Sequence, residues 1–167
     1  MGAMLVIGAT GAFGISSAWR MGLKVRVLRG LITAIETMRN EICDRQTPLP
    51  ELMARLAAET EAPVHRLFRR VTLGMAQLGS RSFYSIWREA VAESSQLELS
   101  ESERHTLLDL GKVLGRYDAE NQSHVLRYTA RRLEGYLGRA EARRQEQGKV
   151  HAVLGLAVGI FVALILM

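Results

Sequence analysis

Apolar residues recur at helical spacing along the chain, beginning with a stripe that steps by three, four, three and seven residues. This spacing places the apolar side chains on one face of an α-helix and leaves the other face polar. The pattern predicts a first helix that ends near Asp44. Its expected buried residues are Val25, Leu28, Ile32, Ile35 and Ile42.

Prolines divide the following segment into shorter helices. Thr47, Pro48 and Leu49 form a helix break, because proline is tolerated only in the first turn of a helix. A short helix should then run to about Glu59. Pro63 opens a further helix, which the pattern predicts over residues 63–78.

The second half of the chain shows three more helical patterns. After a turn at Gly79-Ser80, an aromatic-rich helix is predicted over 82–95. Ser100 and Glu103 have the spacing of a capping box at the start of the next helix. A final helix should begin at Ala119. The expected inward-facing residues are Phe83, Ile86, Trp87, Val91, Leu107, Leu110, Leu114, Tyr117, Leu126, Leu133 and Leu137.

Both ends of the chain lack charged residues: all 22 basic and 17 acidic residues lie between Arg20 and Lys149. A helix of 18 or 19 residues would be about 27–28 Å long, close to the roughly 30 Å hydrocarbon core of a bilayer. The sequence therefore predicts an all-α protein with transmembrane helices over 1–19 and 150–167. Between them, residues 20–149 should form a compact cytoplasmic bundle of about six helices.

Basic residues are concentrated beside the two predicted spans. Residues 20–29 carry four net positive charges and residues 139–149 carry two, whereas residues 30–138 hold 14 basic and 15 acidic groups. Basic flanks tend to stay in the cytoplasm, so both termini should lie on the opposite side of the membrane. The excess positive charge therefore lies beside the predicted spans, where it can attract anionic lipid headgroups. This location argues against nucleic acid as the main partner.

Small residues four positions apart occur in both predicted spans. Such stripes allow close approach of two membrane helices, and we expect the spans to pack on each other through them. The alternative is that small residues are simply common in membrane helices. The residues of the two stripes are Gly8, Ala12 and Ser16 in the first span, and Gly155, Gly159 and Ala163 in the second.

Gly8, Gly11 and Gly14 have the spacing of a dinucleotide-binding turn. That motif needs an acidic residue about 20 positions later on a second strand, but the first acidic residue is Glu36, inside a helical pattern. The pattern therefore argues against a dinucleotide site. Cleavage of a signal peptide near Ser16-Ser17-Ala18 stays an alternative, although the basic n-region is missing.

The sequence shows no local arrangement for catalysis, metal binding or a cofactor. The single cysteine, Cys43, excludes an internal disulfide, and the four histidines lack metal-ligand spacing. Glu101 and Glu103 accompany His105, but they look like charges that compensate a helix dipole. We therefore expect a protein without enzymatic activity.

The chain resembles the stage III sporulation protein AB family of endospore-forming bacteria over essentially its whole length. The resemblance rests on the two uncharged ends, the helix break at 47–49 and Trp87. A more specific signature lies at 110–122. The glycine-rich first span is less hydrophobic than the resemblance leads us to expect. The signature residues are Leu110, Gly111, Leu114, Gly115, Asp118 and Gln122.

This resemblance implies a non-enzymatic scaffold of a transenvelope complex, located in the mother-cell membrane around the forespore. The helical domain would be similar to the cytoplasmic domains of the platform protein of type II secretion and type IV pilus systems. Its implied partners are a hexameric secretion-type ATPase, the stage III sporulation protein AA, and other stage III membrane components. The resemblance leaves stoichiometry open, including assembly into a homo-oligomer.

We interpret the signature as a structural elbow between two helices, with a direct partner surface as the alternative. Gly111 and Gly115 would lie on one helix face and permit a close helix crossing. Asp118 would cap the last helix, and Gln122 would hydrogen-bond back to the turn.

A second possible function uses the basic helix over 63–78. The chain would then be a membrane-tethered regulator or adaptor that binds another soluble partner, such as a kinase or nucleic acid. A solvated helix face explains the same residues more simply. The basic cluster comprises His65, Arg66, Arg69 and Arg70.

Overall fold

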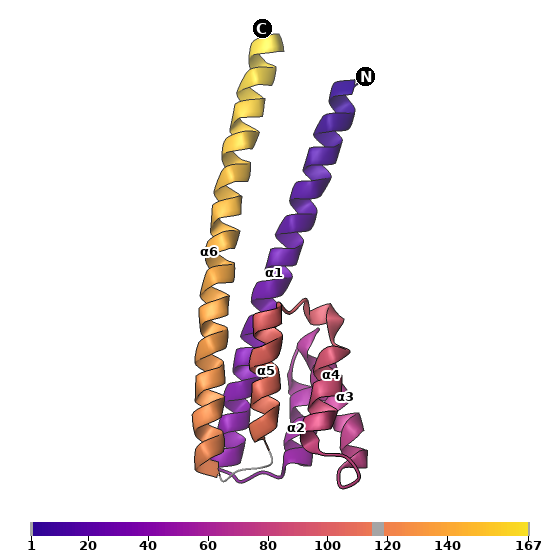
Figure 1. The fold of residues 1–167 in the computed structure, drawn as a ribbon. Helices are drawn as coiled ribbons and strands as arrows, with labels where there is room; N and C mark the ends of the chain where they lie inside the picture. The colour runs from indigo at the N-terminus through magenta and orange to yellow at the C-terminus, as the bar shows by residue number, and fades with distance from the viewer. Residues whose placement is uncertain (1, 115–118, 167) are drawn as a thin grey trace. The chain divides into compact units, whose positions relative to one another are not determined.

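The computed structural model is built from helices, which confirms the predicted all-α class. It describes the backbone of residues 2–114 and 119–166, and the side chains of residues 21–114 and 121–146. Two short 3-10 helices, η1 (Met75–Gln77) and η2 (Ser95–Leu97), follow α3 and α4 (Figure 1). Within the described backbone the α-helices are α1 (Gly2–Cys43), α2 (Leu49–Glu59), α3 (Val64–Gly74), α4 (Phe83–Ala92), α5 (Glu101–Val113) and α6 (Ala119–Leu166).

The chain divides into two compact units. Residues 26–137 form one unit, and residues 1–25 together with 138–167 form the other. The segments predicted to span the membrane, 1–19 and 150–167, lie outside the described side chains. Among the described residues, no helix combines the length and the apolar character needed to cross a bilayer.

The hydrophobic core follows the predicted stripes. All five residues expected on the inner face of α1 are buried, and so are Phe83, Ile86, Trp87 and Val91 of α4. The stripe nevertheless underestimates how much of α1 is buried, because Leu31 and Met38 are buried as well. A single helical stripe predicts one buried face, whereas α1 is covered on more than one side.

Local sequence signals set most helix boundaries. The capping box at the start of α5 is confirmed: the Ser100 amide donates to Glu103 Oε2 at 2.8 Å, and the Glu103 amide donates to Ser100 Oγ at 3.4 Å. The predicted turn at Gly79 is present, with a φ of 109° that favours glycine. Ser82 caps α4 by accepting a hydrogen bond from the Ser85 amide.

The end of α5 differs from the prediction. The apolar stripe placed Leu114 on this helix, but α5 ends at Val113. Tyr117, the next residue of the stripe, lies outside the described residues. Leu114 has extended backbone angles, φ −59° and ψ 126°, and still reaches the core, where it is 1% exposed. Helical spacing alone could not distinguish a buried residue in the helix from one just beyond it.

Candidate functional site

The signature glycine Gly111 is required by a close contact with Trp87. A Cβ atom at position 111 would lie 2.1 Å from Trp87 Cδ1, far inside van der Waals contact. The indole Nε1 of Trp87 donates a hydrogen bond to the Leu107 carbonyl oxygen at 2.7 Å. The Cδ1–Nε1 edge of the indole therefore lies against one turn of α5, and only glycine leaves room for it there.

Two phenylalanines complete the environment of Trp87. The ring centroids of Phe68 and Phe83 lie 6.3 and 5.9 Å from that of Trp87, in tilted arrangements. Trp87 is 1% exposed, so this cluster joins α3, α4 and α5 in the core. Gly111 therefore lies at a close helix contact in the core, and the interpretation of the whole signature as an elbow stays a prediction.

The structure bears less directly on the other half of the signature. Gly115 and Asp118 lie outside the described residues, so the helix face predicted to be shared by Gly111 and Gly115 stays a prediction. The first residue of α6 is Ala119, directly after Asp118. Gln122 is half-buried in the first turn of α6. The capping by Asp118 and the hydrogen bond from Gln122 stay predictions.

The helix break at Thr47, Pro48 and Leu49 is held by a carboxylate at the end of α1. Glu41 is only 6% exposed, and its Oε2 accepts a hydrogen bond from the Thr47 hydroxyl at 2.6 Å. Its Oε1 is 2.8 Å from Arg55 Nη1 on α2 and 3.1 Å from Arg45 Nη1. The hydroxyl of Thr47 and the positive charges of Arg55 and Arg45 lower the pKa of Glu41, although burial opposes the shift.

This Glu41 network was not predicted from the sequence. Thr47 was singled out with the prolines as a helix break, but its partner is a buried carboxylate six residues earlier. A glutamate within an apolar stripe, followed by a threonine at a helix break, is a weak sequence signal. Nothing in the sequence pointed to Arg55, fourteen residues from Glu41.

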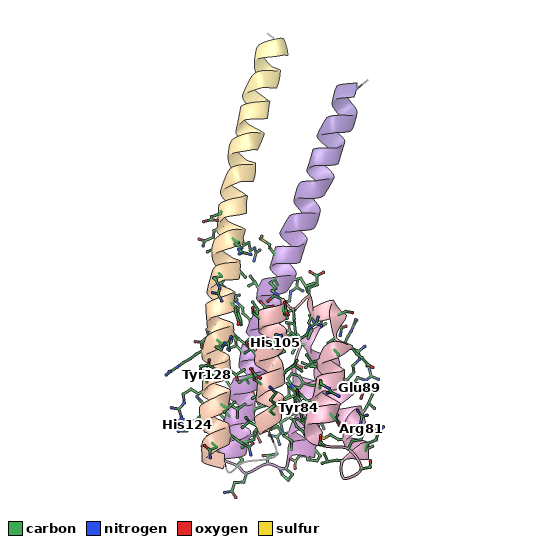
Figure 2. The ribbon with its side chains drawn as sticks, viewed as in Figure 1. Arg81, Tyr84, Glu89, His105, His124 and Tyr128 are labelled. Atoms are coloured by element: carbon green, nitrogen blue, oxygen red, sulfur yellow. The ribbon has the colours of Figure 1, made fainter. Side chains whose placement is uncertain are left out.

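A groove runs between α1 and α6 inside the 26–137 unit. It has a volume of about 250 Å³ and a floor of Ile35, Leu126 and Ala130, all buried. Its charged side chains form no ion pairs with one another or elsewhere in the part of the chain that the structure describes. On the same helix, His124 and Tyr128 project outward (Figure 2). The charged residues of the groove are Glu36, Arg39, Arg127, Arg131 and Glu134.

The basic helix predicted over 63–78 corresponds to α3 and η1. His65 and Arg70 are half-buried, whereas Arg66 and Arg69 are exposed. Leu73, which the sequence analysis did not single out, is 69% exposed on this helix. The sequence contained a signal for this exposure, because Leu73 lies on the same helix face as Arg66 and Arg69.

Among the described residues, no three His, Cys, Asp or Glu side chains are grouped as metal ligands. Cys43 is half-buried. The His105 Nε2 atom is 3.7 Å from Glu101 Oε1 on an exposed helix face, in a surface i, i+4 pair. The proposed packing stripes in the two terminal segments, Gly8 to Ser16 and Gly155 to Ala163, lie outside the described side chains.

Comparison with known proteins gives a consistent result. The family described as stage III sporulation protein AB matches residues 1–167. The stage III sporulation protein AB of Bacillus subtilis (strain 168) is 27% identical over 168 residues, which cover 100% of this chain and 98% of the relative. A solved structure of stage III sporulation protein AB matches with a TM-score of 0.68 and 25% identity, covering 74% of this chain and 98% of the solved one.

These relatives are named as sporulation proteins, and their names describe no enzymatic activity. The match extends through the helix break, the Trp87 cluster and the 110–122 signature. On this evidence, the chain belongs to the stage III sporulation protein AB family and has a role in sporulation.

Proposed function

We propose that the chain is a non-enzymatic, membrane-anchored platform that couples a cytoplasmic secretion-type ATPase to a transenvelope complex between mother cell and forespore. The family match over the whole chain carries this proposal, because it includes both uncharged ends as well as the helical body. The helical body would serve as a rigid adaptor, since its core joins all six described α-helices through buried aromatic and aliphatic side chains.

The proposed location is the mother-cell membrane around the forespore. Residues 1–19 and 150–167 would span the bilayer, because neither contains a charged side chain and each is long enough as a helix. Residues 20–149 would then lie in the cytoplasm, with the basic residues of 20–29 and 139–149 at the inner leaflet. Both termini would lie on the far side.

The proposed partner is the hexameric ATPase of the same set, stage III sporulation protein AA, together with other stage III membrane components. The support is the similarity of the family's helical domain to secretion platform domains, which is a fold-level analogy. The α1–α6 groove is a suitable contact region, since its three arginines and two glutamates are free to pair with a partner's charges.

Co-purification tests the coupling. The full-length chain, tagged and extracted in mild detergent after co-expression with the ATPase of the same organism, should elute together with the ATPase. An unrelated membrane protein with two spans and the same tag is the control. The double charge reversal Arg127→Glu/Arg131→Glu should weaken the complex by about tenfold if the groove is the contact. Elution of the ATPase apart from the wild-type chain would contradict the coupling.

A second candidate function is a membrane-tethered adaptor that binds another soluble partner, a kinase or nucleic acid, through the basic helix over 63–78. The observation that favours it is the exposure of Arg66 and Arg69, which have no ion-pair partner among the described residues. Binding of duplex DNA by the full-length chain at physiological salt, lost in Arg66→Glu/Arg69→Glu, would support the nucleic-acid form of this alternative.

A further inference from the structure

The outer face of α3 combines two exposed cations with an exposed leucine. Arg66, Arg69 and Leu73 are separated by three and four residues, which places them in one row along the helix. Leu73 is 69% exposed although the opposite face of α3 is fully packed. The buried residues of that opposite face are Val64, Leu67, Phe68 and Val71.

An apolar groove lies beside Leu73, between α3 and α4. Its volume is about 260 Å³, and Leu73, Ile86 and Ala90 line it. The groove is shaped by Gly74, where a Cβ atom would lie 2.4 Å from Ile86 Cγ2, so the two helices approach closely there. Leu78, 44% exposed, follows the groove residue Gln77.

Contiguous exposed apolar surface is characteristic of interaction sites and ligand-binding grooves. Among the side chains that the structure describes, only three large hydrophobic residues are strongly exposed: Leu73 lines this groove, and Leu78 directly follows the lining residue Gln77.

Some of the charged side chains around this groove form ion pairs, and others do not. Glu93 pairs with Arg70 at 3.5 Å, and Glu89 pairs with Arg81, so both carboxylates at the rim already have a cation (Figure 2). Arg66 and Arg69 make no ion pair with any residue that the structure describes. The surface therefore presents an apolar groove at one end and two uncompensated positive charges at the other.

We propose that this α3 surface, defined by Arg66, Arg69, Leu73, Leu78 and the groove beside them, binds an amphipathic helix of a partner protein. The partner's apolar side chains enter the groove beside Leu73. Its carboxylates lie opposite Arg69 and Arg66, about 6 and 10 Å along the helix axis from Leu73. An acidic residue one turn from the apolar anchor and another two turns from it is therefore the expected pattern.

The same observations disfavour nucleic acid at this surface. Two cations supply few phosphate contacts. The exposed leucines have no counterpart in a phosphate backbone, whereas they match the apolar face of a helix. The inference does not require the ATPase to be the partner, so it stands or falls separately from the coupling proposed above.

Site-specific photocrosslinking in sporulating cells tests the inference on the full-length chain. A photoreactive amino acid replaces Leu73, and the same amino acid at the exposed position Arg104 of α5 is the matched control. The crosslinked segment is identified by mass spectrometry. We expect a protein segment with helical spacing of apolar residues and carboxylates one to two turns away, and only background crosslinking from position 104.

Charge reversal then separates docking from chance proximity. Arg66→Glu/Arg69→Glu should reduce the Leu73-position crosslink by about tenfold or more, and lysines in place of the partner's two carboxylates should restore it. Arg66→Gln/Arg69→Gln is a milder second variant, and an unchanged melting temperature establishes that both variants fold. The melting temperature of the photoreactive chain establishes the same for position 73.

Three results would overturn the proposal. The first is crosslinking at position 73 no greater than at 104, and the second is a crosslink to nucleic acid, to lipid or to a second copy of the chain. The third is a protein crosslink that the charge reversals leave unchanged. Identification of a partner other than the ATPase would support this docking surface, and the co-purification experiment would decide the ATPase coupling independently.

Discussion

At the scale of single residues, the contact between Trp87 and Gly111 explains why glycine stands at position 111 of the signature. The indole is buried, donates its N–H to Leu107, and occupies the space that any side chain at 111 would need. The sequence pointed to a close helix approach at Gly111. The partner in that approach became known only from the packing of α4 against α5.

Gly111→Ala should destabilise the chain by about 1–3 kcal/mol, because the added methyl group forces the Trp87 ring or the α5 backbone to shift. Urea unfolding of the full-length chain in detergent, followed by tryptophan fluorescence, measures this change in the free energy of unfolding.

The matched control is Gly135→Ala in α6, where an added Cβ would meet nothing within 4 Å. Alanine is the better helix former, so this variant should gain up to about 1 kcal/mol. Equal effects at positions 111 and 135 would show that Trp87 does not impose the glycine.

At the scale of elements, Glu41 fixes the junction between α1 and α2. One carboxylate joins the end of α1 to the Thr47 break and to Arg55 on α2. The pKa of Glu41 is lower in the folded chain than in the unfolded chain. The carboxylate therefore stabilises the fold at pH values above its ordinary pKa of 4.5. This contribution is lost as the pH falls from there through the lower folded pKa.

Glu41→Gln should therefore be less stable than the wild type near neutral pH, and the difference should shrink as the pH falls below 4.5. Urea unfolding across a series of pH values gives the free energies of both chains. Glu36→Gln is the control, because Glu36 is an exposed carboxylate of α1 without an ion pair among the described residues, and the substitution should change stability by less than about 0.5 kcal/mol. A wild-type to Glu41→Gln difference that is constant with pH would contradict the assigned role.

At the scale of the whole molecule, the proposed platform depends on its two uncharged ends. The segment 150–167 contains eleven Leu, Ile, Val or Phe residues and the segment 1–19 only five. Each of these side chains favours insertion by about 0.3–0.6 kcal/mol near a helix centre, so the C-terminal end should be the stronger anchor.

Removal of residues 150–167 should move much of the chain from the membrane fraction to the soluble fraction, and removal of 1–19 should have a smaller effect. Fractionation after alkaline washing measures both. Circular dichroism of the truncated chains checks that the helical body is retained. Recovery of the full-length chain in the soluble fraction would contradict membrane anchoring.

The sequence alone determined the class of fold, the order of the helices and many of their boundaries. These features follow from local physics: apolar spacing, the capping box at Ser100, the prolines near 48 and 63, and the positive φ at Gly79 are set by neighbours a few residues apart. The same local reasoning failed at Leu114, where burial continues after the helix has ended.

Only the tertiary structure decided which distant side chains meet. Trp87 reaches Leu107 across 20 residues, Glu41 reaches Arg55 across 14, and the groove beside Leu73 exists because Gly74 lets α4 approach α3. The apolar periodicity of the sequence predicts which face of a helix is buried, but it does not predict which other helix covers that face. The packing of helices fixes those pairs, and with them the residues left exposed and unpaired on the surface.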